Sequence, residues 1–507
     1  AYGNIKGIVY RIDVTFAEHA DRDTHAGYLE NTIFDSNSLN AYLSKEWDSH
    51  RLAFSFDNYK SDSEVYVDPA VRTTPPFTDF RIDAPQRDRR KWAVFYDGEE
   101  LTELVRSVHL DAYYQDSERD FNTFTDLALD FGGMIVPSST SILTGSELDT
   151  NGGNGLIDLA LGEDNILLVG FEAKTDDLEQ KRNRQVTTAG RAGEPELTIE
   201  EASQTSLELF AEDVWNFAQN WDLRGVARGV WVETKLDKTT RAGIPTDSTS
   251  DSHVLGAVGI KYSGIDNVLI WTGWSQGFVY PTMVNLATGA FAGPNYVNSN
   301  QDLDPETSNS VDLGMRYFED SLTAELSFFS TWADDYIDHI LCTGTGLTCL
   351  GISDDRDRVY DNIDQAQTFG AEFSGEVTVE QFTPYVNLAW LRRRFENAGA
   401  ASYDTGLPAL SGRGGVRVQH AFDATSEGWA DVYFRAASDA DELGRRGTEH
   451  HPGWATLNLS LGLTLGKRAQ YRVVADLLNL TDKEYTPATE NLLARGRSAI
   501  VRVAIDL

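Results

Sequence analysis

The chain has 507 residues, of which 11% are aromatic, and a formal net charge of −36 at pH 7. This charge argues against a nucleic-acid partner, because phosphate binding depends on clustered Lys and Arg. No run of about eighteen apolar residues occurs, which excludes a transmembrane helix and leaves a soluble β protein or a membrane β-barrel.

Alternation of apolar and polar residues begins near the N-terminus and predicts β-strands. Residues 8–16 alternate between an apolar and a mainly polar face, as successive side chains do in a strand. The pattern recurs at residues 39–43 and 52–56, which flank a short turn at Asp48, and at residues 108–115. Short turns and long polar segments therefore alternate along the first part of the chain.

The same rhythm continues to the C-terminus. Residues 157–161 and 167–171, on either side of a turn, alternate, as do residues 457–463; so do residues 268–275 and 311–317, which flank a long Asn-rich segment. We predict about twenty strands of roughly ten residues, which is the length that crosses a membrane when tilted. The direction of the apolar face remains open for the strands near residues 221–232 and 254–262.

A membrane sheet must close on itself, because each backbone N–H and C=O in lipid needs a partner. The predicted fold class is therefore all-β: a large antiparallel transmembrane β-barrel. Apolar stripes are expected to face lipid and polar stripes the lumen, with short periplasmic turns and long extracellular loops.

The two cysteines, Cys342 and Cys349, lie close together in a Gly- and Thr-rich segment. This spacing predicts a small disulfide-closed loop formed in an oxidising compartment. A metal-binding pair is the alternative, but no second Cys pair stands beside it.

Several acidic segments could be taken for ligand-binding sites but have simpler interpretations. Residues 149–155 lack the alternate acidic ligands and closing Glu of a calcium loop, and we expect them to end a loop. Glu200 and Glu201 are expected to lie on solvated loop surface. Nucleophile, zinc-binding and phosphate-binding motifs are absent from the sequence, which predicts no enzymatic activity and no metal site.

Five motifs, which follow one another along the chain in the family's order, carry a resemblance to a known family, and residues 303–308 and 313–317 are the two parts of one of them. Residues 303–308 read Leu-Asp-Pro-Glu-Thr-Ser, residues 313–317 read Leu-Gly-Met-Arg-Tyr, and residues 275–281 read Ser-Gln-Gly-Phe-Val-Tyr-Pro; the others are residues 202–215, 362–372 and 479–485. Together they resemble the TonB-dependent outer-membrane receptors. The motif positions of the central segments are Gly277, Phe278, Pro281, Leu303, Pro305, Glu306 and Thr307.

The resemblance implies a barrel of about 22 strands, preceded in the family by a globular plug. We find neither the plug nor the first two strands in this sequence. Residues 1–507 are therefore interpreted as the transmembrane barrel alone, and a plug domain is expected in the same chain or in a separate one.

The resemblance also implies a function: uptake of an iron complex, either a ferric siderophore or haem, across the outer membrane of a Gram-negative cell. The implied partners are the TonB–ExbB–ExbD energy-coupling complex and outer-membrane lipid with lipopolysaccharide, and no cofactor is expected. Two alternatives stay open, a passive diffusion pore and a surface-binding receptor without transport.

Candidate cargo-binding residues lie in the long loops and near the central motifs. They are His450, His451, Phe291, Tyr296 and Tyr336. A solvated loop position is the simpler interpretation of the two histidines, and girdle or loop packing that of the aromatic residues. Residues 282–300 contain no His, which weakens the prediction of haem as cargo.

Overall fold

The computed structural model describes residues 1–241, 244, 246–292, 295–342, 358–397, 400–444, 447–466, 470–488, 490 and 492–505. Its main feature is one sheet of 25 strands, most of which follow one another in sequence order. The order begins with β1 (Tyr2–Ile5), β2 (Ile8–His19), β5 (Phe34–Trp47), β6 (His50–Val65), β7 (Phe77–Glu99), β8 (Val105–Asp130), β9 (Ile135–Ala160), β10 (Asn165–Thr188), β12 (Glu196–Ala218) and β13 (Trp221–Thr239).

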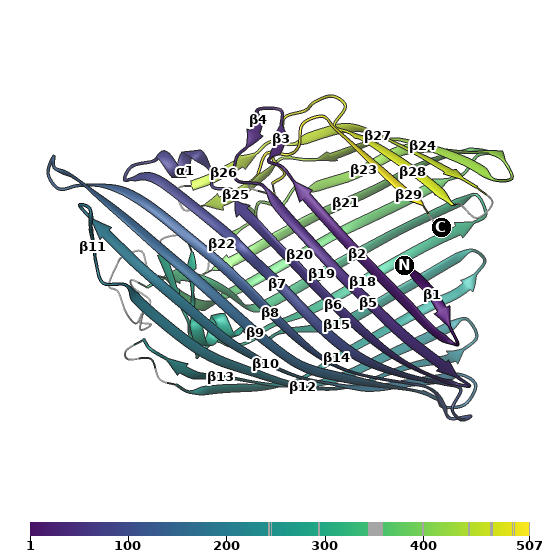
Figure 1. Ribbon diagram of the computed structural model, residues 1–507. Coiled ribbons are helices and arrows are strands. Elements are labelled where there is room, and N and C mark those ends of the chain that lie inside the picture. Colours follow the sequence, from purple (N-terminus) through teal and green to yellow (C-terminus); the bar gives the residue numbers. More distant parts are fainter. Residues whose placement is uncertain are drawn as a thin grey trace.

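The order continues through the second half of the chain. These strands are β14 (Ser248–Ile265), β15 (Val268–Val279), β18 (Glu306–Glu319), β19 (Leu322–Leu341), β20 (Arg358–Val377), β21 (Phe382–Asn397), β23 (Leu410–Asp423), β24 (Ser426–Ala437), β27 (Trp454–Leu465), β28 (Tyr471–Leu478) and β29 (Ser498–Ile505). Each pairs antiparallel with its neighbour, and the sheet curves into two facing walls (Figure 1). The predicted antiparallel barrel is thus confirmed.

The remaining elements are short and lie in or near the long loops. They are β3 (Arg22–Thr24), β4 (Gly27–Leu29), α1 (Pro69–Thr73), β11 (Arg191–Ala192), the π-helical turn η1 (Val284–Thr288), β16 (Ala290–Ala292), β17 (Asn295–Asn298), β22 (Ala400–Ser402), β25 (Ala440–Gly444) and β26 (Gly447–His451). Among the described residues, neither helix is long and apolar enough to cross a membrane.

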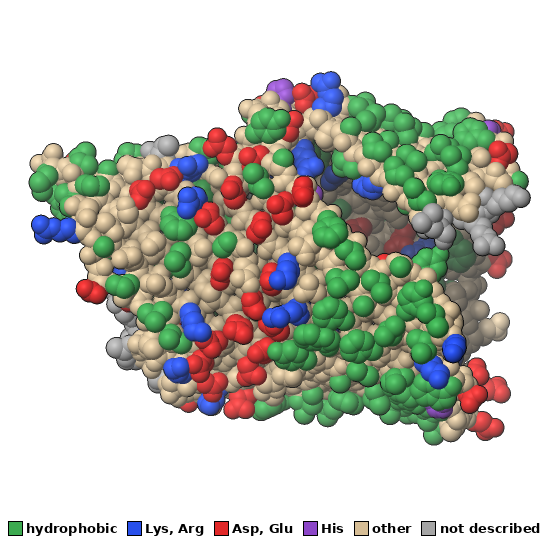
Figure 2. Space-filling model, in the orientation of Figure 1, with side chains coloured by type: hydrophobic (Ala, Val, Ile, Leu, Met, Phe, Trp, Pro, Cys, Tyr) green, Lys and Arg blue, Asp and Glu red, His purple; other side chains and the backbone are tan. Residues whose placement is uncertain are grey.

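Side chains alternate between an outer apolar face and an inner polar face, as predicted. On the outer face Leu110, Leu207 and Leu313 remain 43%, 42% and 49% exposed. On the inner face Asp176 and Asp431 are buried. Figure 2 shows the apolar side chains gathered over the half of the barrel that carries the short turns. This band matches the lipid-facing belt of a membrane barrel.

The faces of β13 and β14, which the sequence leaves open, follow from two exposed residues. Trp231 of β13 is 39% exposed and Val254 of β14 is 76% exposed, so both point outward. Val230 and Val232, on the other face of β13, are buried. The apolar side chains of β13 therefore serve two environments, lipid outside and a packed layer inside.

Strand length is where the sequence-based prediction fails. β8 and β9 have 26 residues each, whereas β28 and β29 have 8 each. Residues 149–155, expected to end a loop, lie inside β9. Crossing the membrane needs only about 9–11 residues, so the longest hairpins continue far beyond it, toward the long loops (Figure 1).

Within the described residues, the end strands β1 and β29 pair only with β2 and β28, and Figure 2 shows a hollow along this seam. The long-loop end of the seam is bridged by the hairpin of β3 and β4. Arg22 donates from Nη1 to the Leu493 carbonyl at 3.2 Å, and His25 Nδ1 lies 3.3 Å from an Asp482 carboxylate oxygen. We call this contact between the first and last long loops the clasp.

Candidate functional site

The long segment between β15 and β18 folds back against the inner wall of the barrel. Its described residues, 281–292 and 295–303, are called the strap below. On one side, Gln204 of β12 donates from Nε2 to the Pro281 carbonyl at 3.3 Å. On the other side, β17 pairs in parallel with the start of β20. The strap thus spans the inner wall from β12 to β20, at the end where the long loops lie (Figure 1).

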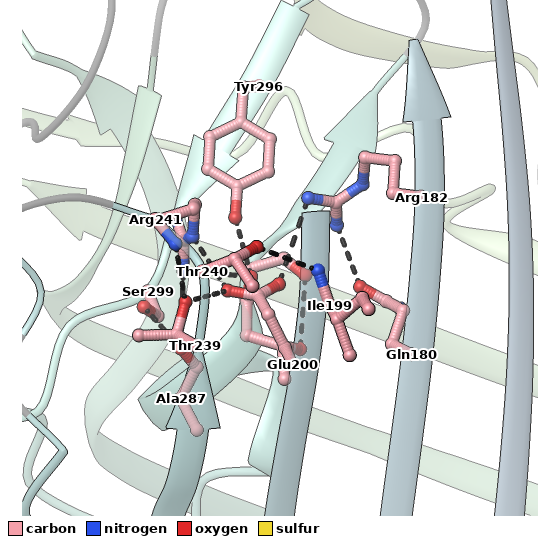
Figure 3. Close-up of polar contacts among 12 residues, drawn as sticks. Gln180, Arg182, Ile199, Glu200, Thr239, Thr240, Arg241, Ala287, Tyr296 and Ser299 are labelled. Atoms are coloured by element: carbon pink, nitrogen blue, oxygen red, sulfur yellow. Dashed lines mark hydrogen bonds and ion pairs between the residues drawn. The ribbon is translucent and has the colours of Figure 1, made fainter. Parts of the chain in front are cut away.

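A buried carboxylate lies where the strap meets the wall. The Glu200 side chain, on the inner face of β12, is 1% exposed. Arg241 donates from Nε to its Oε1 at 2.6 Å, and the Thr239 hydroxyl donates to the same oxygen at 3.3 Å. Arg182 Nη1, from β10, lies 3.7 Å from Oε2. Two guanidinium groups therefore converge on one carboxylate (Figure 3).

The two arginines extend this network to the strap. Arg241 donates from Nη2 to the carbonyls of Ala287 and Thr288, at the end of η1, at 3.5 and 3.3 Å. The Tyr296 hydroxyl donates to the Thr288 carbonyl at 2.5 Å. The guanidinium carbons of Arg182 and Arg241 lie 5.1 and 5.2 Å from the Tyr296 ring centroid. Burial raises the pKa of Tyr296, so its phenol stays a neutral donor.

One buried apolar cluster joins the strap to the wall. Ala202, Leu236 and Ala287 are each at most 2% exposed and form one buried cluster. Ile244 and Met283 pack against its edge. The strap is therefore held to β12 and β13 by a small apolar contact together with the ionic network.

A recess of about 410 Å³ opens on the inner wall near the two ends of the strap. Its lining comes from β15, β18, β19, β20 and β21 and includes Gly277, Phe278, Glu306, Thr307, Tyr336, Arg393 and Phe395. The rings of Tyr336 and Phe395 lie 5.8 Å apart. Arg393 donates from Nε to the Thr368 hydroxyl at 3.1 Å, which leaves the outer part of its guanidinium directed at the recess.

Side-chain hydrogen bonds fix the backbone around this recess. Asn362 accepts from the Asp304 backbone N–H at 2.9 Å and donates to the carbonyls of Asp304 and Asp335 at 2.9 and 2.7 Å. The Glu306 carboxylate accepts from the Ile337 N–H at 2.8 Å. The segments at 303–308 and 362–372, distant in sequence, are thereby joined.

Comparison with known proteins now decides the family. Residues 23–480 match the family described as "TonB dependent receptor-like, beta-barrel". The chain belongs to the TonB-dependent receptor family. As in that family, the barrel lies in the outer membrane.

A curated relative of the receptor is the iron-regulated outer membrane virulence protein of Vibrio cholerae. The two are 24% identical over 353 residues, which cover 66% of this chain and 48% of the relative. The chain thus spans about half the length of this relative.

Solved structures share the fold of this receptor at low sequence identity. The copper transporter OprC has a TM-score of 0.75 and 17% identity, with 99% of this chain and 76% of that chain covered. The FrpB iron transporter from Neisseria meningitidis has a TM-score of 0.71 and 13% identity, with 99% of this chain and 77% of that chain covered. The ferric yersiniabactin uptake receptor FyuA from Yersinia pestis has a TM-score of 0.67 and 13% identity, with 100% of this chain and 77% of that chain covered.

The receptor places its predicted cargo residues in three different surroundings. Tyr336 lines the recess, whereas Tyr296 is packed between two arginines in the strap. Phe291 belongs to β16, and its side chain lies outside the described residues. His450 and His451 lie on β26, where Nδ1 of His450 is 2.7 Å from Asp441 Oδ1 and Nε2 of His451 is 3.3 Å from Glu442 Oε2.

The other predicted site residues are placed as follows. Pro281 and Leu303, both buried, mark the two ends of the strap, and Pro305 immediately precedes β18. Cys342 is disulfide-bonded, while Cys349 lies outside the described residues, so their pairing stays a prediction. In the described part of the chain, no group of three or more His, Cys, Asp or Glu side chains is arranged to hold a metal ion.

The expected loop position of Glu200 and Glu201 is wrong, because both lie in β12. Only Glu201 faces outward, where Lys238 contacts its carboxylate at 2.5 Å. Sequence reasoning also missed Arg182, Arg241 and Arg393. The signal available for Glu200 was the alternation of side chains along β12. Leu207 and Leu209 face outward, so the residue between them faces inward, and so does every second residue before it, down to Glu200.

Proposed function

We propose that this chain is the barrel of an active transporter that takes up an iron complex, a ferric siderophore or haem, across the outer membrane. The TonB–ExbB–ExbD complex would supply the energy, as the family implies. The family match supports this proposal, and so do the names of an iron-regulated relative and of iron and siderophore receptors among the structural neighbours.

The observation that carries the proposal is the recess at the outer mouth. Tyr336 and Phe395 offer aromatic surface, and Arg393 offers a cation that is already oriented by Thr368. Guanidinium groups bind carboxylate and other planar anions well, and aromatic faces stack on flat ligands. An anionic, aromatic iron chelate fits this combination better than haem held by His450 or His451, since both imidazoles lie against carboxylates.

We further propose that a plug domain, in the same or a separate chain, occupies the lumen during transport. A barrel of this width holds an aqueous channel when nothing fills it. An unfilled lumen would instead make the barrel a passive diffusion pore. The dependence of uptake on an energy source therefore distinguishes active transport from passive diffusion.

The test is uptake of iron-55 ferric siderophores by cells that carry or lack the receptor. Arg393→Gln should raise the half-saturating concentration of the transported complex by about tenfold, the usual value of a charge-assisted hydrogen bond. The matched control is Arg394→Gln, because Arg394 follows on the opposite face of β21 and pairs with Glu396 at 2.8 Å.

Two results would count against the proposal. Uptake that persists after the proton gradient is collapsed would identify a passive pore. Equal half-saturating concentrations for the Arg393→Gln and Arg394→Gln variants would show that the transported complex does not bind in the recess.

A further inference from the structure

A trough of about 490 Å³ crosses the inner wall from β19 to β27. Its floor follows one row of directly opposed residues. The row starts at Glu372 of β20, continues through Ala389, Ser411 and Ala437, and ends at Trp454 of β27. Three small side chains in succession leave the wall hollow, and the volume lies in the range of about 300–1,000 Å³ that is typical of small-molecule sites. We propose that the trough binds a short zwitterionic peptide, with its ammonium group toward β20 and its carboxylate toward β24.

The trough faces the lumen, because the residues that alternate with its lining face outward. Phe373, Leu388 and Phe434 are exposed on the lipid-facing side. The trough reaches the last residue of β24 and the first of β27, so this end of it lies at the outer mouth. It is separate from the recess described above, since β21 gives Arg393 to the recess and Ala389, nearer the short turn, to the trough.

Opposite charges are sorted to the two ends of the trough. Glu372 carries a carboxylate at the β20 end, and at the other end the guanidinium carbon of Arg435 lies 5.9 Å from the Trp454 ring centroid. In the part of the chain that the structure describes, neither Glu372 nor Arg435 makes an ion pair. Each end therefore offers one uncompensated charge to a ligand.

The other two charged residues of the lining are compensated within the wall. Glu325 accepts a hydrogen bond from Arg316 Nε at 2.6 Å. Arg413 donates from Nη2 to Asp431 at 2.7 Å. These two pairs keep the same polarity along the trough but need no ligand, so the two unpaired charges decide what the trough binds.

The spacing of the two unpaired charges sets the length of the ligand. β20 and β24 are three strand spacings apart, which is about 14 Å. Three extended residues span about 10 Å, and the Glu372 and Arg435 side chains reach across the remainder. A purely anionic ligand would be repelled at the first end and a purely cationic one at the second, which favours a ligand with opposite charges at its ends. An aromatic side chain beside the ligand carboxylate would stack on Trp454.

Peptide binding in the trough goes beyond the proposed uptake of iron and does not depend on it. Guanidinium groups bind carboxylates strongly, whatever molecule carries them. Because the readout below is equilibrium binding, it can succeed or fail whatever the receptor transports.

The experiment is isothermal titration calorimetry of the full-length receptor, purified from outer membranes in detergent, with the tripeptide Gly-Gly-Phe as the probe. Two blocked forms of the probe are compared with it: N-acetylation removes the ammonium charge, and C-terminal amidation removes the carboxylate charge. Each blocked peptide should bind at least about tenfold more weakly than the free peptide, because each loses one charge-assisted hydrogen bond.

Two variants assign each end of the peptide to its residue. Arg435→Gln should abolish the preference for a free carboxylate and keep the preference for a free amine, and Glu372→Gln should do the reverse. Glu376→Gln is the matched control, because Glu376 lies on the same face of β20, nearer the short turn and outside the trough. It should leave both preferences within about twofold.

Heat-modifiable gel mobility shows whether each variant is folded, and the comparison of free with blocked peptides on the unaltered receptor needs no variant. Equal affinity for the free and blocked peptides, or no binding of the free peptide, overturns the proposal. An equal loss of affinity for all three peptides in the Arg435→Gln receptor also overturns it, because the carboxylate would then not be bound by Arg435.

Discussion

Gly415 makes room for a polar cluster that lines the lumen on β23 and β24. There Arg413 donates from Nη2 to Asp431 at 2.7 Å, and its guanidinium carbon lies 3.7 Å from the Tyr433 ring centroid. A Cβ at Gly415 would lie 2.6 Å from both the Val432 carbonyl oxygen and the Tyr433 Cβ. Gly415→Ala should therefore lower barrel stability by about 1–3 kcal/mol, the usual cost of overpacking.

The comparison for this change is Gly225→Ala on β13, where an added Cβ would meet no atom within 4 Å. Both variants remove the same backbone freedom, so their difference isolates the steric conflict. The measurement is the temperature at which the heat-modifiable gel band converts to the unfolded position. A Gly415→Ala protein as stable as Gly225→Ala would show that β24 moves aside without cost.

At the scale of single residues, sequence reasoning named Tyr336, Glu306 and Thr307, which line the recess, but neither Arg393 nor the buried network around Glu200. Glu306 and Thr307 belong to residues 303–308, a short segment that the sequence alone reveals through its resemblance to the receptor family. Glu200 meets Arg241 because β13 pairs with β12, and Tyr296 joins them only because a strap from about eighty residues later folds onto β12. Parity predicts that Glu200 points inward, but its burial depends on that long-range packing, which no local pattern records.

Strands were predictable from the sequence within the lipid-facing belt, where lipid imposes apolar–polar alternation, and were not predictable outside that belt. Outward positions such as Leu207 and Leu313 follow from alternation, because lipid requires apolar side chains there. Above the belt, β7 to β10 and β12 continue with polar residues on both faces, as at residues 149–155. Alternation then vanishes although the hydrogen-bonded ladder does not, so the long hairpins were interpreted as loops.

The outer face of these long hairpins carries a row of directly opposed carboxylates. Asp88, Glu118, Glu147, Glu179 and Glu201 are cross-strand neighbours on β7, β8, β9, β10 and β12. Like charges in such positions repel, typically by about 0.2–1 kcal/mol per pair. Glu147→Gln, in the middle of the row, should therefore raise stability by up to about 1 kcal/mol.

Thermal unfolding in detergent at low and high salt tests this prediction. Glu325→Gln is the opposite case, because the carboxylate of Glu325 accepts a hydrogen bond from Arg316 Nε at 2.6 Å and its loss should not stabilise the barrel. Salt screens repulsion between exposed charges, so the gain from Glu147→Gln should shrink as salt rises. A gain that is independent of salt would refute the electrostatic explanation.

Across the whole molecule, the chemistry of lipid predicts a sheet that closes on itself, whereas in the described residues the end strands β1 and β29 do not pair with each other and the clasp bridges the seam instead. The clasp brings the hairpin at residues 22–29 against residues 482–497, segments more than 450 residues apart in the sequence. An isolated antiparallel bridge between Thr24 and Arg495 lies at its centre. The hydrogen bond from the Arg497 N–H, with support from His25, lowers the pKa of Asp482, so this carboxylate is ionised in the clasp.

The bridge between Thr24 and Arg495 predicts a disulfide in the double variant Thr24→Cys and Arg495→Cys. Directly opposed residues of an antiparallel pair have Cα atoms about 4.5–5.5 Å apart, which is within the range that a disulfide spans. The crosslink would close nearly the whole chain into a ring, so the unreduced, heat-denatured protein should migrate faster on a gel than the reduced one. Lys6→Cys with Arg495→Cys is the control, because Lys6 lies in the turn between β1 and β2 at the opposite end of the barrel. If the control pair crosslinks as readily as the clasp pair, the two loops are not held together and the seam is not bridged at its outer end.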